Sequence, residues 1–230
     1  MRAKDRTTIV RLAGELRADR SPAEPQVRSR PARNRQPNKT RDALLEAAAR
    51  IFNSAGYHGT DSNRIAREAG YAPGTFYIHF ADKLAIFLEV YEGWVSTEWT
   101  SIEAILKSGG TARELRKRLS RTVLEHHRKW RTFRASLRAL SATDDRVHAA
   151  RVASRARQIE TMTRLLSTRG APMPGRARML AQLLIAEALC DAVADGDAKS
   201  LGIGEGEIVR LLDESSRDLL TEPTQPVPSA

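Results

Sequence analysis

The stretch from Thr60 to Leu84, TDSNRIAREAGYAPGTFYIHFADKL, constrains the fold more than any other part of the chain. Asp61 or Ser62 can cap a helix, because a side-chain oxygen at this position accepts a hydrogen bond from a free backbone N–H. Gly70 suits the end of that helix, where a left-handed residue without a Cβ costs little. Pro73 suits the first turn of a second helix. Two short helices joined by a glycine-containing turn are the geometry that places a second helix in the DNA major groove.

Composition and charge favour a helical protein with an acidic partner. Aromatic residues make up 5% of the 230 residues, and long alternating runs of β-branched residues are missing, which predicts an all-α fold. The formal charge of +10 favours a partner such as nucleic acid. No apolar run reaches the roughly 18 residues of a membrane span, and the N-terminus lacks the apolar core of a signal peptide. We therefore expect a cytoplasmic protein.

The sequence lacks the usual motifs of enzymes, cofactor sites and metal sites. Cys190 is the only cysteine, so we expect a buried core thiol and neither an internal disulfide nor a thiolate zinc site. His126 and His127 are adjacent and cannot share one helix face, which argues against a two-histidine metal site. A P-loop, a glycine-rich dinucleotide turn and a GxSxG elbow are also missing. We expect no metal, no cofactor and no enzymatic activity.

The chain divides by composition into four parts. Residues 1–37 contain ten Lys or Arg, four Asp or Glu and four prolines, so we expect a basic, disordered arm. Such an arm can reach along phosphates or into a minor groove, and a solvated tail is the alternative. Residues 38–84 hold the helix-turn-helix, residues 85–221 form a larger helical domain, and residues 222–230 are a proline-rich tail, expected to be disordered. Helices are expected over residues 38–55, 82–107, 111–130, 133–140, 146–168, 175–194 and 205–220.

The strings AREAG, GTFYIHF and ADKLAIF, in this order and spacing, resemble the DNA-binding signature of the tetracycline-repressor (TetR) family of transcriptional regulators. The resemblance covers about residues 40–88. It implies a three-helix DNA-binding domain followed by a larger helical domain that binds an effector and forms a homodimer. The expected function is that of a repressor released from a palindromic operator by a small apolar or amphipathic effector. A non-specific architectural DNA-binding protein that relies on the arm is the alternative.

The resemblance also implies which residues contact DNA. Gly74 lets the backbones approach closely, Thr75 and Tyr77 offer hydroxyls to phosphates or bases, and His79 and Lys83 bind phosphates. The chain departs from the family at Asp61, Ser62, Ala72 and Pro73, which shifts the expected base readout toward Thr75, Tyr77, Asn63 and Arg64. A buried phenol at Tyr77 and a packing role for His79 are the alternatives. The expected DNA contacts are Thr60, Asn63, Arg64, Gly74, Thr75, Tyr77, His79, Lys83 and Arg41.

The resemblance implies an effector pocket and a dimer interface in the larger domain. The expected pocket residues are large apolar side chains: Trp94, Trp99, Ile102, Leu106, Trp130, Phe133 and Leu137. A basic run of Arg146, Arg151, Arg155 and Arg157 can hold an anionic effector, although a solvated face is favoured. The expected dimer stripes are Leu180, Leu183, Leu184, Glu187 and Cys190/Asp191 on one helix, and Ile208, Leu211, Leu212 and Leu219 on the last. Ordinary intrachain core is the alternative for these stripes.

Overall fold

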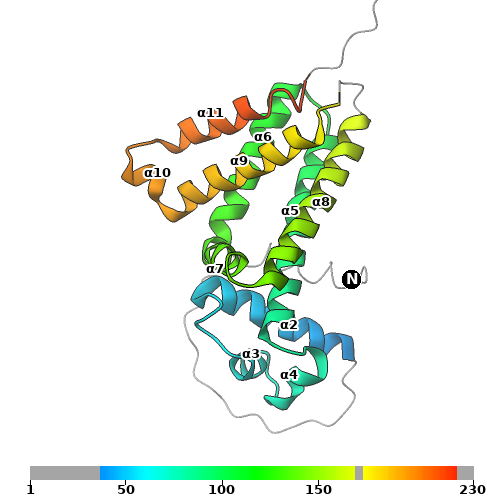
Figure 1. The fold of residues 1–230 in the computed structure, drawn as a ribbon, viewed down its shortest axis with the longest axis vertical. Helices are drawn as coiled ribbons and strands as arrows, with labels where there is room; N and C mark the ends of the chain where they lie inside the picture. Colours follow the sequence, from blue (N-terminus) through cyan, green and yellow to red (C-terminus); the bar gives the residue numbers. More distant parts are fainter. Residues whose placement is uncertain (1–36, 169–172, 222–230) are drawn as a thin grey trace, which may run out of the picture. The chain divides into compact units, whose positions relative to one another are not determined.

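The computed structural model describes residues 37–168 and 173–221, and within these ranges all regular structure is helical (Figure 1). The expected all-α fold is therefore confirmed. The chain divides into two compact units, of which unit 1 ends at Thr97 and unit 2 begins at Glu98. Residues 1–36 of the expected arm and the expected tail 222–230 lie outside the described residues. In the part of the chain that is described, no helix is both long and apolar enough to cross a lipid bilayer.

Unit 1 is a small helical domain around an aromatic core. It contains α2 (Pro37–Ala55), α3 (Ser62–Glu68), α4 (Gly74–His79) and the first part of α5 (Lys83–Lys107). Phe52 and Phe87 meet edge to face with ring centroids 5.1 Å apart. Ile65 and Phe76 are also fully buried, so α3 and α4 each supply a side chain to this core. Burial of these side chains fixes the positions of two helices that are too short to be stable alone.

The described residues of unit 2, 98–168 and 173–221, contain the end of α5 and six further helices. These are α6 (Ala112–Lys129), α7 (Arg131–Ser141), α8 (Asp145–Ser167), α9 (Arg176–Asp195), α10 (Asp197–Ser200) and α11 (Glu205–Ser215). A capping box begins α6: the Glu114 N–H donates to Thr111 Oγ1 at 3.3 Å, and the Thr111 N–H donates to Glu114 Oε2 at 3.0 Å. α9 packs against α6, α8 and α11 (Figure 1).

The end of the chain differs from the expected long helix over residues 205–220. α11 ends at Ser215, and residues 216–219 form turns. The hydroxyls of Ser215 and Ser216 donate to the Leu212 carbonyl at 3.0 and 2.9 Å. Serine side chains that bond nearby carbonyls compete with helix continuation, which explains the earlier end. Gly196 has φ of +92° and ends α9, and the short α10 follows it.

Cys190 lies in an apolar cluster of unit 2, as expected. This thiol is fully buried beside Leu124, Ile208 and Leu212. Burial raises the pKa of Cys190 to about 12, so the thiol stays protonated near neutral pH. A second cluster in unit 2 contains Ile105, Ala112, Leu115, Ile159, Leu166, Met179, Leu219 and Leu220.

A layer of ion pairs in unit 2 is formed around the buried Arg134. α9 carries Glu187, Asp191 and Asp195 at four-residue spacing, which places the three carboxylates on one face. Arg134 is 2% exposed and binds Asp191 through two hydrogen bonds, Nε to Oδ1 at 2.6 Å and Nη2 to Oδ2 at 2.8 Å. The other pairs are Arg138 with Asp191 and Asp195, Arg131 with Asp195, and Arg151 and Arg155 with Glu187. Two of the four arginines in the expected basic run, Arg151 and Arg155, therefore form ion pairs with another helix of the chain.

His127 is held between two carboxylates of this layer. Its Nδ1 lies 3.1 Å from Asp191 Oδ1, and its Nε2 lies 3.5 Å from Glu98 Oε1. Burial opposes the charged imidazole, but the carboxylates of Asp191 and Glu98 outweigh it and raise the pKa of His127. Burial likewise opposes ionisation of Glu98 and Asp191, but nearby positive groups hold the pKa of both carboxyls below the usual range. The imidazolium form of His127 therefore persists to higher pH in the folded state than in the unfolded chain.

This arrangement predicts a stability that depends on the charge of His127. Because its folded-state pKa lies above the unfolded value of about 6.5, its stabilisation is complete below that pH and is lost as pH rises through the folded-state pKa. We expect His127→Gln to lower the free energy of unfolding at pH 6 by roughly 2–4 kcal/mol, because the buried Glu98 loses the charge of its imidazolium partner and Asp191 loses one of its positive neighbours. The difference between the proteins should shrink toward pH 9. Urea unfolding across this range measures it, with the exposed His148→Gln as control. A difference that does not change with pH would contradict the assignment.

Candidate nucleic-acid interface

α3 and the turn after it form as their local sequence predicts. Asp61 is the N-cap, and its Oδ1 accepts the Arg64 N–H at 2.7 Å. Gly70 has φ of +80°, and the Tyr71 N–H that follows it donates to the Ala66 carbonyl at 2.9 Å. This left-handed glycine with a long backward hydrogen bond is a Schellman motif. It ends α3 and turns the chain toward α4 within a few residues.

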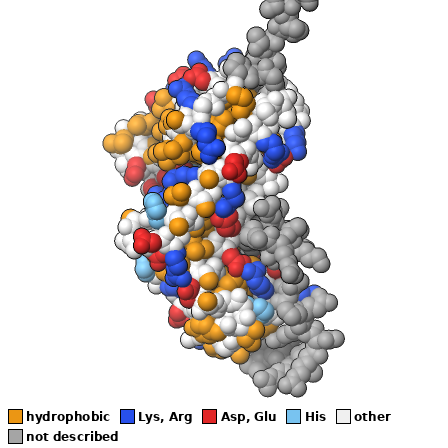
Figure 2. Space-filling view, turned by 45° about the vertical axis from the view of Figure 1, so that its right-hand side comes forward, with side chains coloured by type: hydrophobic (Ala, Val, Ile, Leu, Met, Phe, Trp, Pro, Cys, Tyr) orange, Lys and Arg blue, Asp and Glu red, His pale blue; other side chains and the backbone are white. Residues whose placement is uncertain are grey.

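α4 has one buried and one exposed face. Phe76 is 0% exposed, and Phe80 just after the helix is 3% exposed, so these rings hold α4 on the core as expected. Tyr77 is 60% exposed, which rules out the alternative of a buried phenol. The surface of unit 1 at the end that carries α3 and α4 is rich in hydrophobic side chains (Figure 2). The exposed face of α4 is therefore available to a partner.

Gly74 lies on this exposed face. A Cβ atom placed on Gly74 would meet no heavy atom of the chain within 4 Å. Packing inside the described part of the protein therefore gives no reason for a glycine here. The absence of a side chain instead allows an external backbone to approach α4 closely.

Lys83 points into unit 1. Its Nζ donates to the carbonyls of Tyr57 at 2.9 Å and Thr60 at 2.8 Å, and it lies 4.1 Å from the centre of the Tyr57 ring. Burial lowers the pKa of Lys83, and the nearby Asp61 partly offsets this effect. The ammonium therefore ties the segment before α3 to the start of α5. Phosphate binding, which the resemblance implies for this lysine, stays a prediction.

Arg41 and His79 are neighbours with internal contacts. The Arg41 guanidinium forms an ion pair with Glu89 and lies 5.0 Å from the centre of the Phe80 ring. Burial and the positive charge of Arg41 both lower the pKa of His79. His79 is therefore mainly neutral near pH 7 and offers one N–H to a partner.

The nine expected contact residues differ in exposure. Asn63, Arg64, Gly74 and Tyr77 are exposed, Arg41, Thr75, His79 and Lys83 are half-buried, and Thr60 is buried. Arg64 also donates from Nη1 to the Gly59 carbonyl at 2.8 Å. The sequence reasoning missed Ile78, which is 78% exposed on α4. Its position four residues after Gly74 and next to Tyr77 is the signal that places it on the same face.

The residues expected to line an effector pocket are largely buried. In unit 2, Trp130, Phe133 and Leu137 are at most 2% exposed, and the Trp130 and Phe133 rings meet edge to face at 5.6 Å. Trp99, Ile102 and Leu106 are half-buried. Trp94 belongs to unit 1 and is 3% exposed. A shared cavity for these side chains stays a prediction.

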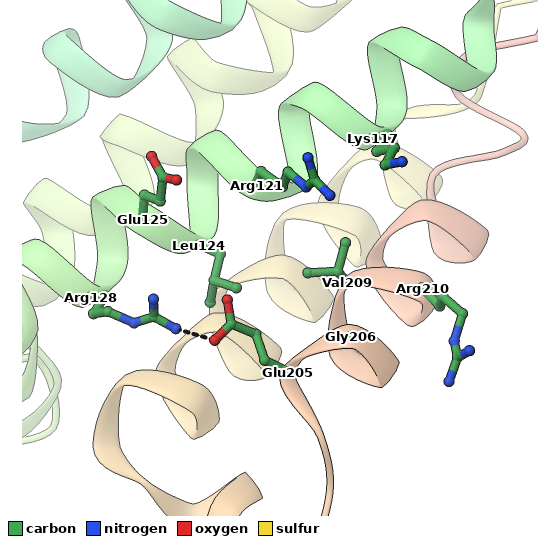
Figure 3. Close-up of a pocket in the computed structure, with 9 residues that line it drawn as sticks. All are labelled: Lys117, Arg121, Leu124, Glu125, Arg128, Glu205, Gly206, Val209 and Arg210. Atoms are coloured by element: carbon green, nitrogen blue, oxygen red, sulfur yellow. Dashed lines mark hydrogen bonds and ion pairs between the residues drawn. The ribbon is translucent and has the colours of Figure 1, made fainter.

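Unit 2 has an open groove of about 520 Å³ between α6 and the first turns of α11 (Figure 3). Leu124 and Val209 supply apolar surface, and Arg128 donates to Glu205 across the groove at 2.6 Å. Lys117, Arg121 and Arg210 add positive charge, against one further acid, Glu125. The lining is thus both apolar and basic, and it was not predicted from the sequence.

Comparison with known proteins gives a family match over residues 44–90, to the model described as "Bacterial regulatory proteins, tetR family". The matched range contains most of α2, all of α3 and α4, and the start of α5. The chain is 30% identical over 71 residues to a fatty acid metabolism regulator protein of Bacillus subtilis, which is 31% of this chain and 37% of that protein. It is 33% identical over 91 residues to the transcriptional activator FasR of Mycolicibacterium smegmatis, which is 39% of this chain and 40% of that protein.

These curated relatives are therefore matched over less than half of their own length. Among solved structures, a TetR-family transcriptional regulator from Streptomyces coelicolor superposes with a TM-score of 0.60. The superposition covers 80% of this chain and 95% of that chain at 22% identity. A likeness at this identity concerns the fold, and it extends the similarity from unit 1 to most of the chain.

The contacts of Lys83 predict a structural effect. We expect Lys83→Ala to lower the free energy of unfolding by about 1–3 kcal/mol, because two carbonyls lose a charged donor. Lys107→Ala is the matched control at the other end of α5, where the side chain is 67% exposed and pairs with Glu103. This exposed pair should contribute less than about 1 kcal/mol. Urea unfolding measures both variants, and equal losses would contradict a special role for Lys83.

Proposed function

Because the chain belongs to the TetR family of bacterial regulatory proteins, we propose that it is a DNA-binding transcriptional regulator, a homodimeric repressor that leaves a palindromic operator when a small effector binds. The observation that carries this proposal is the family match over a helix-turn-helix whose second helix, α4, has an exposed outer face. Exposed Asn63, Arg64, Gly74 and Tyr77 are the proposed contacts to DNA, with Thr75 and His79 at the edge of this face. Thr60, Arg41 and Lys83 reach phosphates only if their present contacts open.

The surface of α9 supports the proposed dimer. Leu180, Leu184 and Ile185 are 37%, 43% and 39% exposed, and Leu211 of α11 is 47% exposed. Figure 2 shows hydrophobic side chains gathered on the surface at the α9–α11 end of unit 2. Four other members of the expected stripes, Cys190, Ile208, Leu212 and Leu219, are buried within the chain, which favours the alternative of intrachain core for them. A helix that is apolar on its outer face as well as its inner face needs a partner on both.

The proposed homodimer determines how the two copies of α4 are spaced on DNA. A two-fold axis relates the two copies of α4, which then enter successive major grooves about one turn of DNA apart. The operator is therefore palindromic, with one half-site for each subunit.

The effector is proposed to be small and apolar or amphipathic. The mixed apolar and basic lining of the groove between α6 and α11, and the charged layer inside unit 2, favour an amphipathic molecule. α5 contributes residues to both units, so a shift of this helix is the proposed route by which an effector alters DNA binding. An effector that abolishes DNA binding while α5 stays unchanged between free and bound crystal structures would refute this route.

Selection of bound sequences from random duplex DNA at near-physiological salt tests the proposed function. We expect the full chain to recover a palindrome with two half-sites. Recovery of DNA without an enriched sequence would refute the specific regulator. It would favour the architectural alternative, in which affinity depends on charge and falls steeply with salt.

The proposed dimer predicts the effect of a charge on α9. We expect Leu184→Asp to convert the dimer to a monomer, because each interface would bury an unpaired carboxylate. Affinity for an operator with two half-sites should fall by roughly a hundredfold, since two linked sites become one. Light scattering after size-exclusion chromatography and fluorescence anisotropy measure the two effects. Val152→Asp, at a 52% exposed position of α8, is the matched control and should stay dimeric. An unchanged mass for Leu184→Asp would place the interface elsewhere.

A further inference from the structure

The outer face of α4 is poor in hydrogen-bonding side chains. Pro73, Gly74, Tyr77 and Ile78 follow the spacing i, i+1, i+4 and i+5, so they share one face, and all four are exposed. The Tyr77 hydroxyl is the only polar side-chain group among these four residues. A face of this kind cannot distinguish bases mainly by paired hydrogen bonds.

Ile78 stands out on this face. It is 78% exposed, the largest exposed fraction among the large hydrophobic side chains of residues 39–168 and 173–221. Local folding does not call for an isoleucine here, because β-branched residues are weaker helix formers than leucine or alanine. The same branching gives isoleucine essentially one χ1 rotamer in a helix. Ile78 therefore presents a rigid apolar surface that loses little side-chain freedom when it binds.

We propose that Ile78 reads the 5-methyl group of thymine in the major groove, and that each operator half-site carries a thymine at the position facing it. This inference rests on the proposed function of specific DNA binding. Among the four bases, only thymine presents a methyl group in the major groove, and apolar side chains recognise it by contact. Exposed Arg64 and Arg67 on α3 supply the positive charge that phosphates require, so the apolar face of α4 is left for the bases.

The contribution of the methyl contact to DNA affinity is large enough to measure. Removing one buried methyl group weakens an apolar contact by about fourfold in the dissociation constant. Deoxyuridine differs from thymidine only by this methyl group and keeps the same base pair. Replacing thymidine by deoxyuridine therefore tests the methyl contact alone.

The experiment measures binding of the full chain to the selected operator, with each thymine of a half-site replaced by deoxyuridine in turn. For the unaltered protein we expect about fourfold weaker binding at one or two positions in each half-site and little change elsewhere. For Ile78→Ala we expect weaker binding to the thymine operator and no further loss at those positions. Val152→Ala, an apolar truncation at an exposed site in unit 2, should behave like the unaltered protein.

The outcomes separate this inference from the proposed function. If selection recovers no enriched sequence, both fail together. If a specific operator is recovered but its half-site lacks a constant thymine, or deoxyuridine is tolerated everywhere, the methyl contact alone is refuted. The same result follows if Ile78→Ala retains the full sensitivity to deoxyuridine. Circular dichroism checks that Ile78→Ala stays folded, as its high exposure leads us to expect.

Discussion

Unit 2 depends on the double hydrogen bond between Arg134 and Asp191. Two groups that would each be costly to bury alone compensate one another, and the arrangement fixes the rotation of α9 about its axis. With Asp191 turned inward, Glu187 and Asp195 follow it, because they lie one turn before and after. Leu184 lies seven residues before Asp191 and so on nearly the same side of α9, but it is 43% exposed. This side of α9 therefore changes along the helix, from exposed leucines in its first half to ion-paired carboxylates in its second half.

The sequence predicts features that depend on neighbouring residues better than features that depend on residues far away in the chain. Asp61 and Gly70 act on the backbone within a few residues, so the start and end of α3 follow from local chemistry. The direction of Lys83 does not, because the carbonyls that it binds lie 26 and 23 residues earlier in the chain. The shorter α11 has a local cause, since Ser215 and Ser216 bond back to the helix, but the apolar period through Leu219 masked it.

The candidate DNA-binding surface combines predicted and unpredicted residues. Family resemblance placed Tyr77 and Gly74 on it, and both are exposed. It also suggested cationic contacts at Arg41 and Lys83, whose charges are already engaged with a carboxylate and with backbone carbonyls. Side-chain charge alone could not separate these roles, since an inward and an outward lysine look the same in a sequence. Ile78 was missed for the opposite reason, because an apolar residue in a helix is normally assigned to the core.

Cys190 offers a practical consequence for labelling experiments. The thiolate is the reactive form of cysteine, and this thiol is both inaccessible and held protonated. Maleimides and spin labels therefore react slowly with the folded chain, although it contains a cysteine. A second cysteine introduced at an exposed position would carry the label alone, without prior replacement of Cys190. Labels on two copies of the chain would then test the proposed dimer through the distance between them.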